Sequence, residues 1–400
     1  MTRRPALLSL LAFAILLTAG FLVAAPRPPR PLSPEAHALV ARAFEGLDPA
    51  RPLVDHHTHL IGNGKGASGI EVNPVMFSWT HPKKRLMTGE YLRAAGVPDD
   101  AHFTEAYVDH LVALARAFPR PFRIHLLAMD RNHRPDGSVD AEATEFYVPN
   151  DLVLKAAEAH PDVFVPVVSI HPARPDAIQE LDRCADRGAR FLKWLPNAQG
   201  IDPADPRYDA FYRRMVERHI TLLTHAGEEK AVDLAGAQAY GNPLKLRRPL
   251  DLGVRVIVAH GASLGMNEDL DHPGTQAANF DLFTRLLAEP KYEGRLFADL
   301  SAITQANRMP GPLTAILEHP EWSRRFINGS DFPLPAIDLV IWTRSFAKQG
   351  FITKAERKAL NEIWKANPLL FDFVLKRTLH HPKTGARLPE ACFGPMPGGY

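Results

Sequence analysis

The sequence predicts an α/β protein built as a (β/α)8 barrel of the TIM type, preceded by a hydrophobic N-terminal segment. Eight short apolar runs recur along the chain, and the stretches between them carry apolar residues at helical spacing. Alternation of strands and helices is typical of a parallel sheet, and eight strands in 400 residues indicate closure into a barrel. An open doubly wound sheet is the alternative, but the chain lacks the glycine fingerprint of that fold.

The predicted strands begin with VDHHTHL and end with RRFINGSDFP. They cover residues 54–60, 122–129, 163–170, 190–196, 219–227, 254–262, 295–302 and 324–333. Continuous apolar runs of this kind are typical of parallel strands buried on both faces. Helices are expected where apolar residues recur every three or four positions, in residues 107–118, 178–185, 208–216 and 280–287.

The N-terminus predicts a targeting segment. No charged residue occurs between Arg4 and Arg27, and this apolar run is near the ~20 residues that span a bilayer. We expect residues 1–25 to form an uncleaved membrane anchor, because Pro26 follows the small-residue cleavage pattern; a cleaved signal peptide is the alternative. The body of the protein is then exported, either anchored and facing the periplasm or exterior, or secreted.

The rest of the chain divides into three parts. A Pro-rich linker is expected over residues 26–34, the barrel over residues 35–378, and a C-terminal tail over residues 379–400. Ser33 and Pro34 are typical of a helix start, as the capping residue and the first-turn residue. The tail is rich in Gly and Pro, and we expect it to pack loosely.

Composition narrows the class of protein. The net charge of +2 gives no electrostatic case for binding nucleic acid, and the chain has no Gly-rich phosphate loop. Cys184 and Cys392 are expected to be free thiols, since two cysteines cannot build a disulfide framework. The expected partners are a small-molecule substrate and, through residues 1–25, a membrane. Nothing in the sequence indicates an oligomeric state.

The first predicted strand is unusual in its histidines. Alternate residues of a strand face the same side, so His57 and His59 point together, and Asp55 falls on the same face. Two imidazoles placed in this way can reach one metal ion. A surface strand that is rich in histidine is the alternative.

Four other predicted strands carry a polar residue in or at their C-terminal ends. These residues are Lys193 in FLKWLP, His225 in LLTHAG, His260 in VIVAHG and Asp331 in INGSDFP. The C-terminal ends of barrel strands converge on one opening. Burying these groups without compensation is costly, and a shared metal ion supplies that compensation.

Two long segments, residues 61–102 and 129–151, follow the first and second strands and are expected to lie on the same face of the barrel. The first contains a short basic stretch with His81, Lys83, Lys84 and Arg85. They could bind a substrate carboxylate or form a solvated basic loop, and we favour the solvated loop.

Several of these motifs, in order along the chain, resemble the amidohydrolase superfamily of metal-dependent barrel hydrolases. DHHTH offers the H-x-H of the first strand, and LTHAG, VAHG and NGSDFP resemble the signatures of the fifth, sixth and eighth strands. KWLPNAQGIDPADPRYDAFY and ANPLLFDF resemble the fourth-strand region and the closing helix of the "amidohydrolase 2" branch, which includes relatives of aminocarboxymuconate semialdehyde decarboxylase. The resemblance runs from about Val54 to Phe373.

The resemblance implies a metal site. His57, His59, His225 and Asp331 would bind one divalent ion, zinc in most relatives. His260 would be a second-metal ligand or a substrate-facing acid/base. In binuclear relatives the lysine equivalent to Lys193 is carboxylated and bridges two ions; we favour one ion.

The implied activity is hydrolysis of a small ester, lactone or amide by metal-activated water, with Asp331 and His260 as the catalytic residues. A non-oxidative decarboxylase on the same barrel is the first alternative. The second is an inactive, anchored binding protein, which predicts missing metal ligands. Candidate substrate-binding residues are Trp194, Asn197, His171 and His81.

Overall fold

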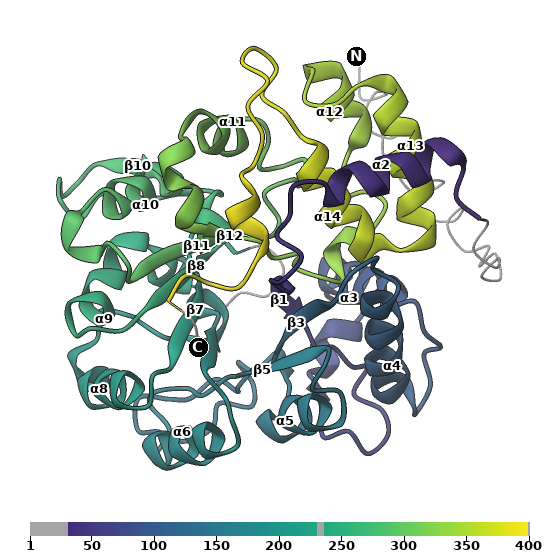
Figure 1. Ribbon diagram of the computed structural model, residues 1–400. Coiled ribbons are helices and arrows are strands. Elements are labelled where there is room, and N and C mark those ends of the chain that lie inside the picture. Colours follow the sequence, from purple (N-terminus) through teal and green to yellow (C-terminus); the bar gives the residue numbers. More distant parts are fainter. Residues whose placement is uncertain (1–30, 230–235, 399–400) are drawn as a thin grey trace, which may run out of the picture.

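The computed structural model describes residues 31–229 and 236–398, and its centre is an eight-stranded parallel sheet (Figure 1). The strands follow one another in space in the order in which they occur in the chain. They are β1 (Leu53–His59), β3 (Phe122–Leu127), β5 (Phe164–Val168), β6 (Phe191–Trp194), β7 (Thr221–His225), β8 (Val256–Ala259), β11 (Leu296–Asp299) and β12 (Phe326–Ile327). Each lies within or overlaps one of the eight predicted runs, so the predicted barrel is confirmed.

The sheet nearly closes on itself between β1 and the segment that follows β12. The Asp331 amide donates to the His57 carbonyl over 2.7 Å, and the His59 amide donates to the Phe332 carbonyl over 2.9 Å. These bonds hold residues 328–332 against β1 although β12 itself is only two residues long. The seam therefore places Asp331 directly beside the two histidines of β1.

Strand alternation predicted that Asp55 shares a face with His57 and His59, and this prediction is wrong. The Asp55 side chain instead stabilises the seam. The pairing of β1 with β3 shifts register between Asp55 and Thr58, which breaks the alternation. The buried Asp55 carboxylate accepts hydrogen bonds from the His57 amide over 3.0 Å and the Ser330 amide over 2.8 Å. It also accepts from the Thr58 hydroxyl over 2.9 Å.

Helices surround the barrel and form a separate layer at one side (Figure 1). The four predicted helices fall in α4, α6, α8 and α10, and α2, α13 and α14 pack against one another. The helices are α2 (Pro34–Phe44), α3 (Pro82–Ala94), α4 (Phe103–Arg116), α5 (Asn150–Ala159), α6 (Ala177–Asp186), α7 (Pro196–Gln199), α8 (Asp209–Glu217), α9 (Arg247–Asp251), α10 (Asn279–Leu287), α11 (Gly311–Glu318), α12 (Thr343–Gln349), α13 (Lys354–Ala366) and α14 (Pro368–Thr378). The short strands are β2 (Glu71–Val72), β4 (Phe146–Tyr147), β9 (Met266–Glu268) and β10 (Gln276–Ala278).

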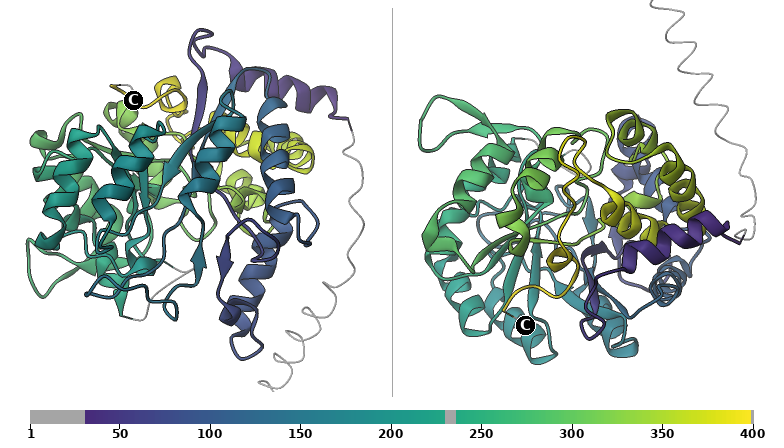
Figure 2. Two further views of the ribbon diagram at one scale, coloured as in Figure 1. Left: turned by 90° about the horizontal axis from the view of Figure 1, so that it is seen from below. Right: turned by 45° about the horizontal axis from the view of Figure 1, so that its top comes forward.

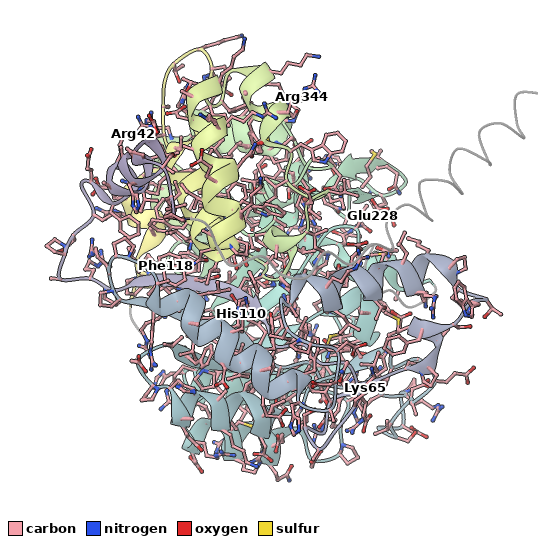
Figure 3. The ribbon with its side chains drawn as sticks, turned by 90° about the vertical axis from the view of Figure 1, so that its right-hand side faces the viewer. Arg42, Lys65, His110, Phe118, Glu228 and Arg344 are labelled. Carbon is pink, nitrogen blue, oxygen red and sulfur yellow. The ribbon has the colours of Figure 1, made fainter. Side chains whose placement is uncertain are left out.

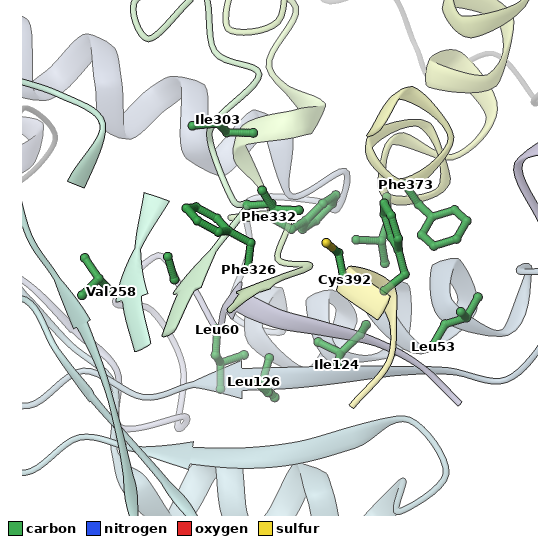
Figure 4. Packing of buried hydrophobic residues seen from close by; sticks show 14 of the residues in the cluster. Leu53, Leu60, Ile124, Leu126, Val258, Ile303, Phe326, Phe332, Phe373 and Cys392 are labelled. Atoms are coloured by element: carbon green, nitrogen blue, oxygen red, sulfur yellow. The ribbon is translucent and has the colours of Figure 1, made fainter. Parts of the chain in front are cut away.

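The apolar core has two parts. The larger part fills the layer between the strands and the helices, where Phe326, Phe332 and Phe373 pack (Figure 4). The smaller part fills the inside of the barrel with residues from seven of its strands, together with Met396 of the C-terminal tail. Cys184 and Cys392 are both buried and free, as expected.

The C-terminal tail is packed into the barrel, and the expectation of loose packing is wrong. Its short helical turn η9 (Glu390–Phe393) contacts β1 and β12, and Phe393 and Met396 are fully buried. The Asn328 amide donates to the Cys392 carbonyl over 2.6 Å. The Gly and Pro residues of the tail lie in its turns, and its few apolar side chains, such as Phe393 and Met396, are buried against the barrel.

We expect Phe393→Ala to lower the free energy of unfolding by about 3–5 kcal/mol, the range for removing a buried aromatic ring. Urea unfolding followed by tryptophan fluorescence measures this change. Lys383→Ala, at an exposed position of the same tail, is the matched control and should leave stability unchanged. An unchanged midpoint for Phe393→Ala would show that the tail does not stabilise the barrel.

The predicted anchor or signal peptide over residues 1–25 lies outside the described residues. Within residues 31–229 and 236–398, no helix has both the length and the apolar character needed to cross a bilayer.

Candidate active site

The ends of β1 and β12 bring together two histidines and one aspartate that could hold a metal ion. The His59 Nε2 atom lies 3.1 Å from Asp331 Oδ1, and the His57 Nε2 atom lies 3.6 Å from the same oxygen. One ligand atom from each of the three residues lies within 4.8 Å of the other two. His57 and Asp331 are buried and His59 is partly exposed, so the cluster opens towards solvent on one side.

Asp299, at the end of β11, orients His57. Its Oδ2 atom lies 2.8 Å from His57 Nδ1, so the ring donates there and leaves Nε2 facing the cluster. The other oxygen accepts from the His260 amide over 2.9 Å and the Ser301 amide over 3.0 Å. Asp299 is fully buried, and burial alone would raise the pKa of its carboxyl. The neighbouring rings of His57 and His260 instead hold this pKa well below the usual range. A carboxylate behind a ligand histidine fixes its tautomer and raises its basicity.

Sequence reasoning missed Asp299, although a signal for it was present. Asp299 ends RLFAD, the apolar run of the seventh predicted strand. His225 and His260 occupy the equivalent end positions of the fifth and sixth predicted strands.

We expect Asp299→Ala to weaken metal affinity by about 10- to 100-fold, because His57 loses the carboxylate that orients it. Competition with a chromogenic chelator measures the affinity. Asp109→Ala, at an exposed position of α4, is the control and should bind metal as the unaltered protein does. Equal affinities for the two variants would contradict the orienting role.

His260 lies directly after β8, at the start of a short turn, η5 (His260–Ala262). Its ring stacks on that of His57 with centroids 5.1 Å apart, and its Nε2 atom lies 3.8 Å from Asp331 Oδ2. Burial lowers the pKa of His260 to about 3, so the imidazole is neutral. Both His260 and Asp331 have positive φ angles, 58° and 61°, a strained conformation that concentrates at functional sites.

His225 supplies the clearest test of whether the site suits a metal. It ends β7, its ring centroid is 5.4 Å from that of His260, and burial lowers its pKa well below the ordinary value. Its buried Nε2 atom has no hydrogen-bond partner among the described residues. A buried polar atom without a partner is costly, and coordination of a cation by the neutral imidazole would satisfy it. The donor set therefore fits a divalent metal.

Lys193, on β6, lies next to the ligand cluster. Its Nζ atom is 3.1 Å from His57 Nε2, and burial lowers its pKa to about 8. This position would allow a carboxylated lysine to reach a metal held by His57, so the alternative of two ions stays a prediction.

A cavity of about 330 Å³ opens above these residues, a size that suits a small molecule. His57, His59, Lys193, His225, His260 and Asp331 all line it. Its walls are largely apolar, with Ile61, Val72, Met76, Met87, Leu92, Met129, Phe146, Leu195, Leu264, Leu334 and Val340.

The long segment after β1 covers one side of this cavity, as its position predicted. It contains a helix, α3, that was not predicted, because the charged residues of its first turn and Gly89 interrupt the apolar spacing. Figure 2 shows α3 and β2, in purple to blue, projecting from one end of the barrel. In Figure 3, Lys65 of this segment and Glu228, which lines the cavity, lie on the opposite side of the view from Arg42 of α2.

Trp194 and Asn197 do not line the cavity. Trp194 follows Lys193 on β6, and because successive strand residues face opposite sides, its ring packs outside the barrel against Phe211. Its Nε1 atom donates to the Ile170 carbonyl over 2.8 Å. Asn197 is buried and donates to the Gly227 carbonyl over 3.1 Å, so it ties α7 to the loop after β7.

His171 and His81 also lie away from the cavity lining. His171 is buried with its Nε2 atom 3.0 Å from the Gln199 carbonyl oxygen, and His81 is exposed at the start of α3. Lys84 forms an ion pair with Glu145, and Arg85 donates to the Phe77 carbonyl over 2.6 Å. Lys83 is exposed, and these residues lie at the protein surface as the favoured interpretation expected, although Lys83, Lys84 and Arg85 belong to the first turn of α3 and not to a loop.

Four titratable side chains of the cavity lining had no sequence motif to mark them. They are Tyr91, Glu228, Glu229 and Arg308. Tyr91 lies on the unpredicted helix α3, and Glu228 and Glu229 lie in the loop after β7. Arg308 comes from the irregular segment after β11 and is 92% buried, with a relative exposure of 8%.

The fold and this cluster define a class of protein: a (β/α)8-barrel enzyme with a candidate site for a divalent metal and a cavity for a small-molecule substrate. The chain belongs to the amidohydrolase family, whose family model matches residues 54–336. No curated protein matches the chain.

Solved structures with a similar fold include three barrel proteins of low identity. An uncharacterised protein from Bordetella bronchiseptica is 17% identical, with 77% of this chain and 94% of that chain covered and a TM-score of 0.46. A putative 2-pyrone-4,6-dicarboxylic acid hydrolase from Pseudomonas putida is 15% identical, with 80% and 98% covered and a TM-score of 0.41. A 5-carboxyvanillate decarboxylase from Novosphingobium aromaticivorans is 11% identical, with 80% and 95% covered and a TM-score of 0.40. The family assignment rests on the family model alone.

Proposed function

We propose that this protein is a metal-dependent hydrolase of a small ester, lactone or amide. The observation that carries the proposal is the position of the Asp331 carboxylate between two kinds of group. One oxygen faces the candidate ligands His57 and His59, and the other faces the neutral ring of His260. One side chain can thus bind a metal and take part in proton transfer.

His57, His59 and Asp331, whose ligand atoms lie close together, would hold one divalent ion together with His225, whose Nε2 atom lacks a partner among the described residues. Zinc is the best match to such a histidine and carboxylate set. When bound, the ion supplies Lewis acidity, which polarises a carbonyl and lowers the pKa of water from 15.7 to about 7.

The side chains around the ligands supply the proton transfers. Asp331 can accept the proton of the attacking water and pass it to the leaving group. The His260 Nδ1 atom lies 3.1 Å from the Ser301 carbonyl oxygen and donates there. Nε2 of His260 therefore carries the lone pair that faces Asp331, and it can share the transferred proton.

The cavity limits the substrate. Its volume of about 330 Å³ and its apolar walls suit a compact molecule with an apolar body. The uncharged stretch between Arg4 and Arg27 supports the further proposal that the enzyme acts outside the cytoplasm, either anchored to a membrane or secreted.

Proton release from a panel of aryl esters, lactones and amides tests the proposal. We expect turnover with full-length protein supplied with zinc, and none with His225→Ala. Carbon dioxide release from aromatic carboxylic acids, measured in parallel, distinguishes the decarboxylase. Carbon dioxide release without hydrolysis would overturn the proposal in favour of a decarboxylase, and inactivity in both assays despite bound metal would favour a binding protein.

A further inference from the structure

A groove in the helical layer has no part in the mechanism proposed above. It has a volume of about 570 Å³ and is formed mainly by α12, α13 and the segment that precedes α12. The Thr343 hydroxyl of α12 donates to the side-chain oxygen of Asn361 in α13 over 2.9 Å and ties these two walls together. No described residue lines both this α12–α13 groove and the active-site cavity, so the groove is a separate feature of the surface.

The α12–α13 groove is basic. Its lining contains four basic residues, Arg344, Lys348, Arg357 and Lys365, against one acidic residue, Asp338. Among the residues that the structure describes, none of the four basic side chains forms an ion pair, although Glu362 meets part of the charge of Lys365. In Figure 3, Arg344 lies at the top edge of the helical layer. A cluster of cations without paired carboxylates favours an anionic ligand.

The segment before α12 exposes two large apolar side chains beside these basic residues. Leu339 is 77% exposed, and Trp342, which lines the groove, is 55% exposed. The Trp342 Nε1 atom donates to the Leu339 carbonyl over 2.8 Å, so the two residues are held next to each other. A tryptophan with an apolar ring and a polar edge is typical of the boundary between membrane and water. Basic residues combined with exposed Trp and Leu suit the surface of an anionic membrane.

The described chain begins beside this groove. The Ser33 amide, at the start of α2, donates to Glu362 of α13 over 3.3 Å, and Asn361 and Lys365 of the same helix line the groove. Residues 26–32 separate Ser33 from the uncharged N-terminal stretch, and a chain of this length reaches at most about 25 Å. A bilayer that holds residues 1–25 therefore keeps the groove near its surface. The linker itself does not match the groove, since Arg27 and Arg30 carry the same charge as its lining.

We propose that the α12–α13 groove docks on anionic phospholipid headgroups of the membrane that holds residues 1–25. This inference rests on the proposed membrane anchoring and is independent of the hydrolase mechanism. The groove then makes a second contact that fixes the orientation of the barrel. Val340 of the active-site cavity directly precedes Ile341 of the groove, so the docked protein holds its active site beside the membrane.

Tryptophan quenching in vesicles tests the docking. Full-length protein is reconstituted into phosphatidylcholine vesicles with bromine-labelled acyl chains, with and without phosphatidylglycerol. We expect stronger quenching with phosphatidylglycerol, and Trp342→Phe should remove most of the excess. Trp79→Phe is the matched control, since Trp79 is 79% exposed in the segment before α3, and it should keep the excess. Equal quenching in the two lipids, or an excess that survives Trp342→Phe, would overturn the docking.

The basic residues are tested by a double substitution. Arg344→Gln with Lys348→Gln should weaken docking by about fivefold for each charge removed, the usual contribution of a basic residue near an anionic membrane. Lys83→Gln with Lys155→Gln, at exposed positions of α3 and α5, is the matched control and should dock as the unaltered protein does. Equal docking of the two double variants would overturn the role of the groove.

Flotation of the same samples separates this inference from the anchoring on which it rests. Full-length protein that does not float with phosphatidylcholine vesicles is not anchored by residues 1–25. If it still binds phosphatidylglycerol vesicles through Trp342, the groove stands and the anchor is removed. Binding of free glycerol phosphate, measured by calorimetry in detergent, without any preference for phosphatidylglycerol vesicles would assign the groove to a soluble anion and overturn the docking.

Discussion

Asp331→Asn is expected to lower kcat by about 10²- to 10⁴-fold, the usual range for loss of a general acid–base group. The substitution removes the carboxylate that faces both the candidate ligands and His260 while keeping its size. Steady-state hydrolysis of the best substrate from the panel measures the change, and elemental analysis of the same sample reports the bound metal.

The metal content of Asp331→Asn shows which role of Asp331 causes the loss of activity. Loss of activity with the ion retained supports the proton-transfer role, whereas loss of both supports a role in binding the ion. Asp136→Asn, at an exposed position of the loop after β3, is the matched control and should be fully active. An Asp331→Asn enzyme with unaltered kcat would contradict the mechanism.

His225→Ala is expected to reduce the metal content from one equivalent per chain to less than about a tenth, because structural and catalytic histidine sites lose their ion when a ligand is removed. The Nε2 atom of His225 is buried and has no hydrogen-bond partner within residues 31–229 and 236–398, so the proposed ion would be its partner. Elemental analysis of full-length protein, purified without chelators and in bicarbonate, gives the stoichiometry.

Lys193→Ala separates the one-ion and two-ion arrangements in the same experiment. With one ion, Lys193→Ala should keep its equivalent of metal, since the lysine amine contacts His57 but does not ligate. Two equivalents in the unaltered protein, falling in Lys193→Ala, would show a carboxylated bridge and contradict the mononuclear site. Metal retained in His225→Ala would contradict the ligand assignment itself.

The barrel and the positions of the six strand-end residues could be predicted because their signals are local. Buried parallel strands are continuous apolar runs, so each strand is marked by its own residues. The rule that parallel strand ends converge then places Lys193, His225, His260 and Asp331 near the histidines of β1. The family model over residues 54–336 agrees with the resemblance seen in these motifs.

Other positions depended on contacts that no local pattern records. Trp194 belongs to a recognisable stretch, but the alternation of β6 turns it away from the cavity. The helix α3 lacks a clear apolar face, and its fold depends on packing over the cavity. Asp55 left the histidine face because the pairing of β1 with β3 shifts register between Asp55 and Thr58.

The sequence by itself determined the barrel, the family and the residues that could bind a metal. The reason is that the apolar pattern of each strand and the polar residue at its end are local features, visible within a few consecutive residues. Only the tertiary structure decided which side chains orient and complete the site. Asp299 is 242 residues from His57 in the chain, and Arg308 reaches Ser263 from another loop. Likewise, the tail fills the barrel with Met396. Such contacts join distant segments, and their geometry follows from how the whole barrel closes.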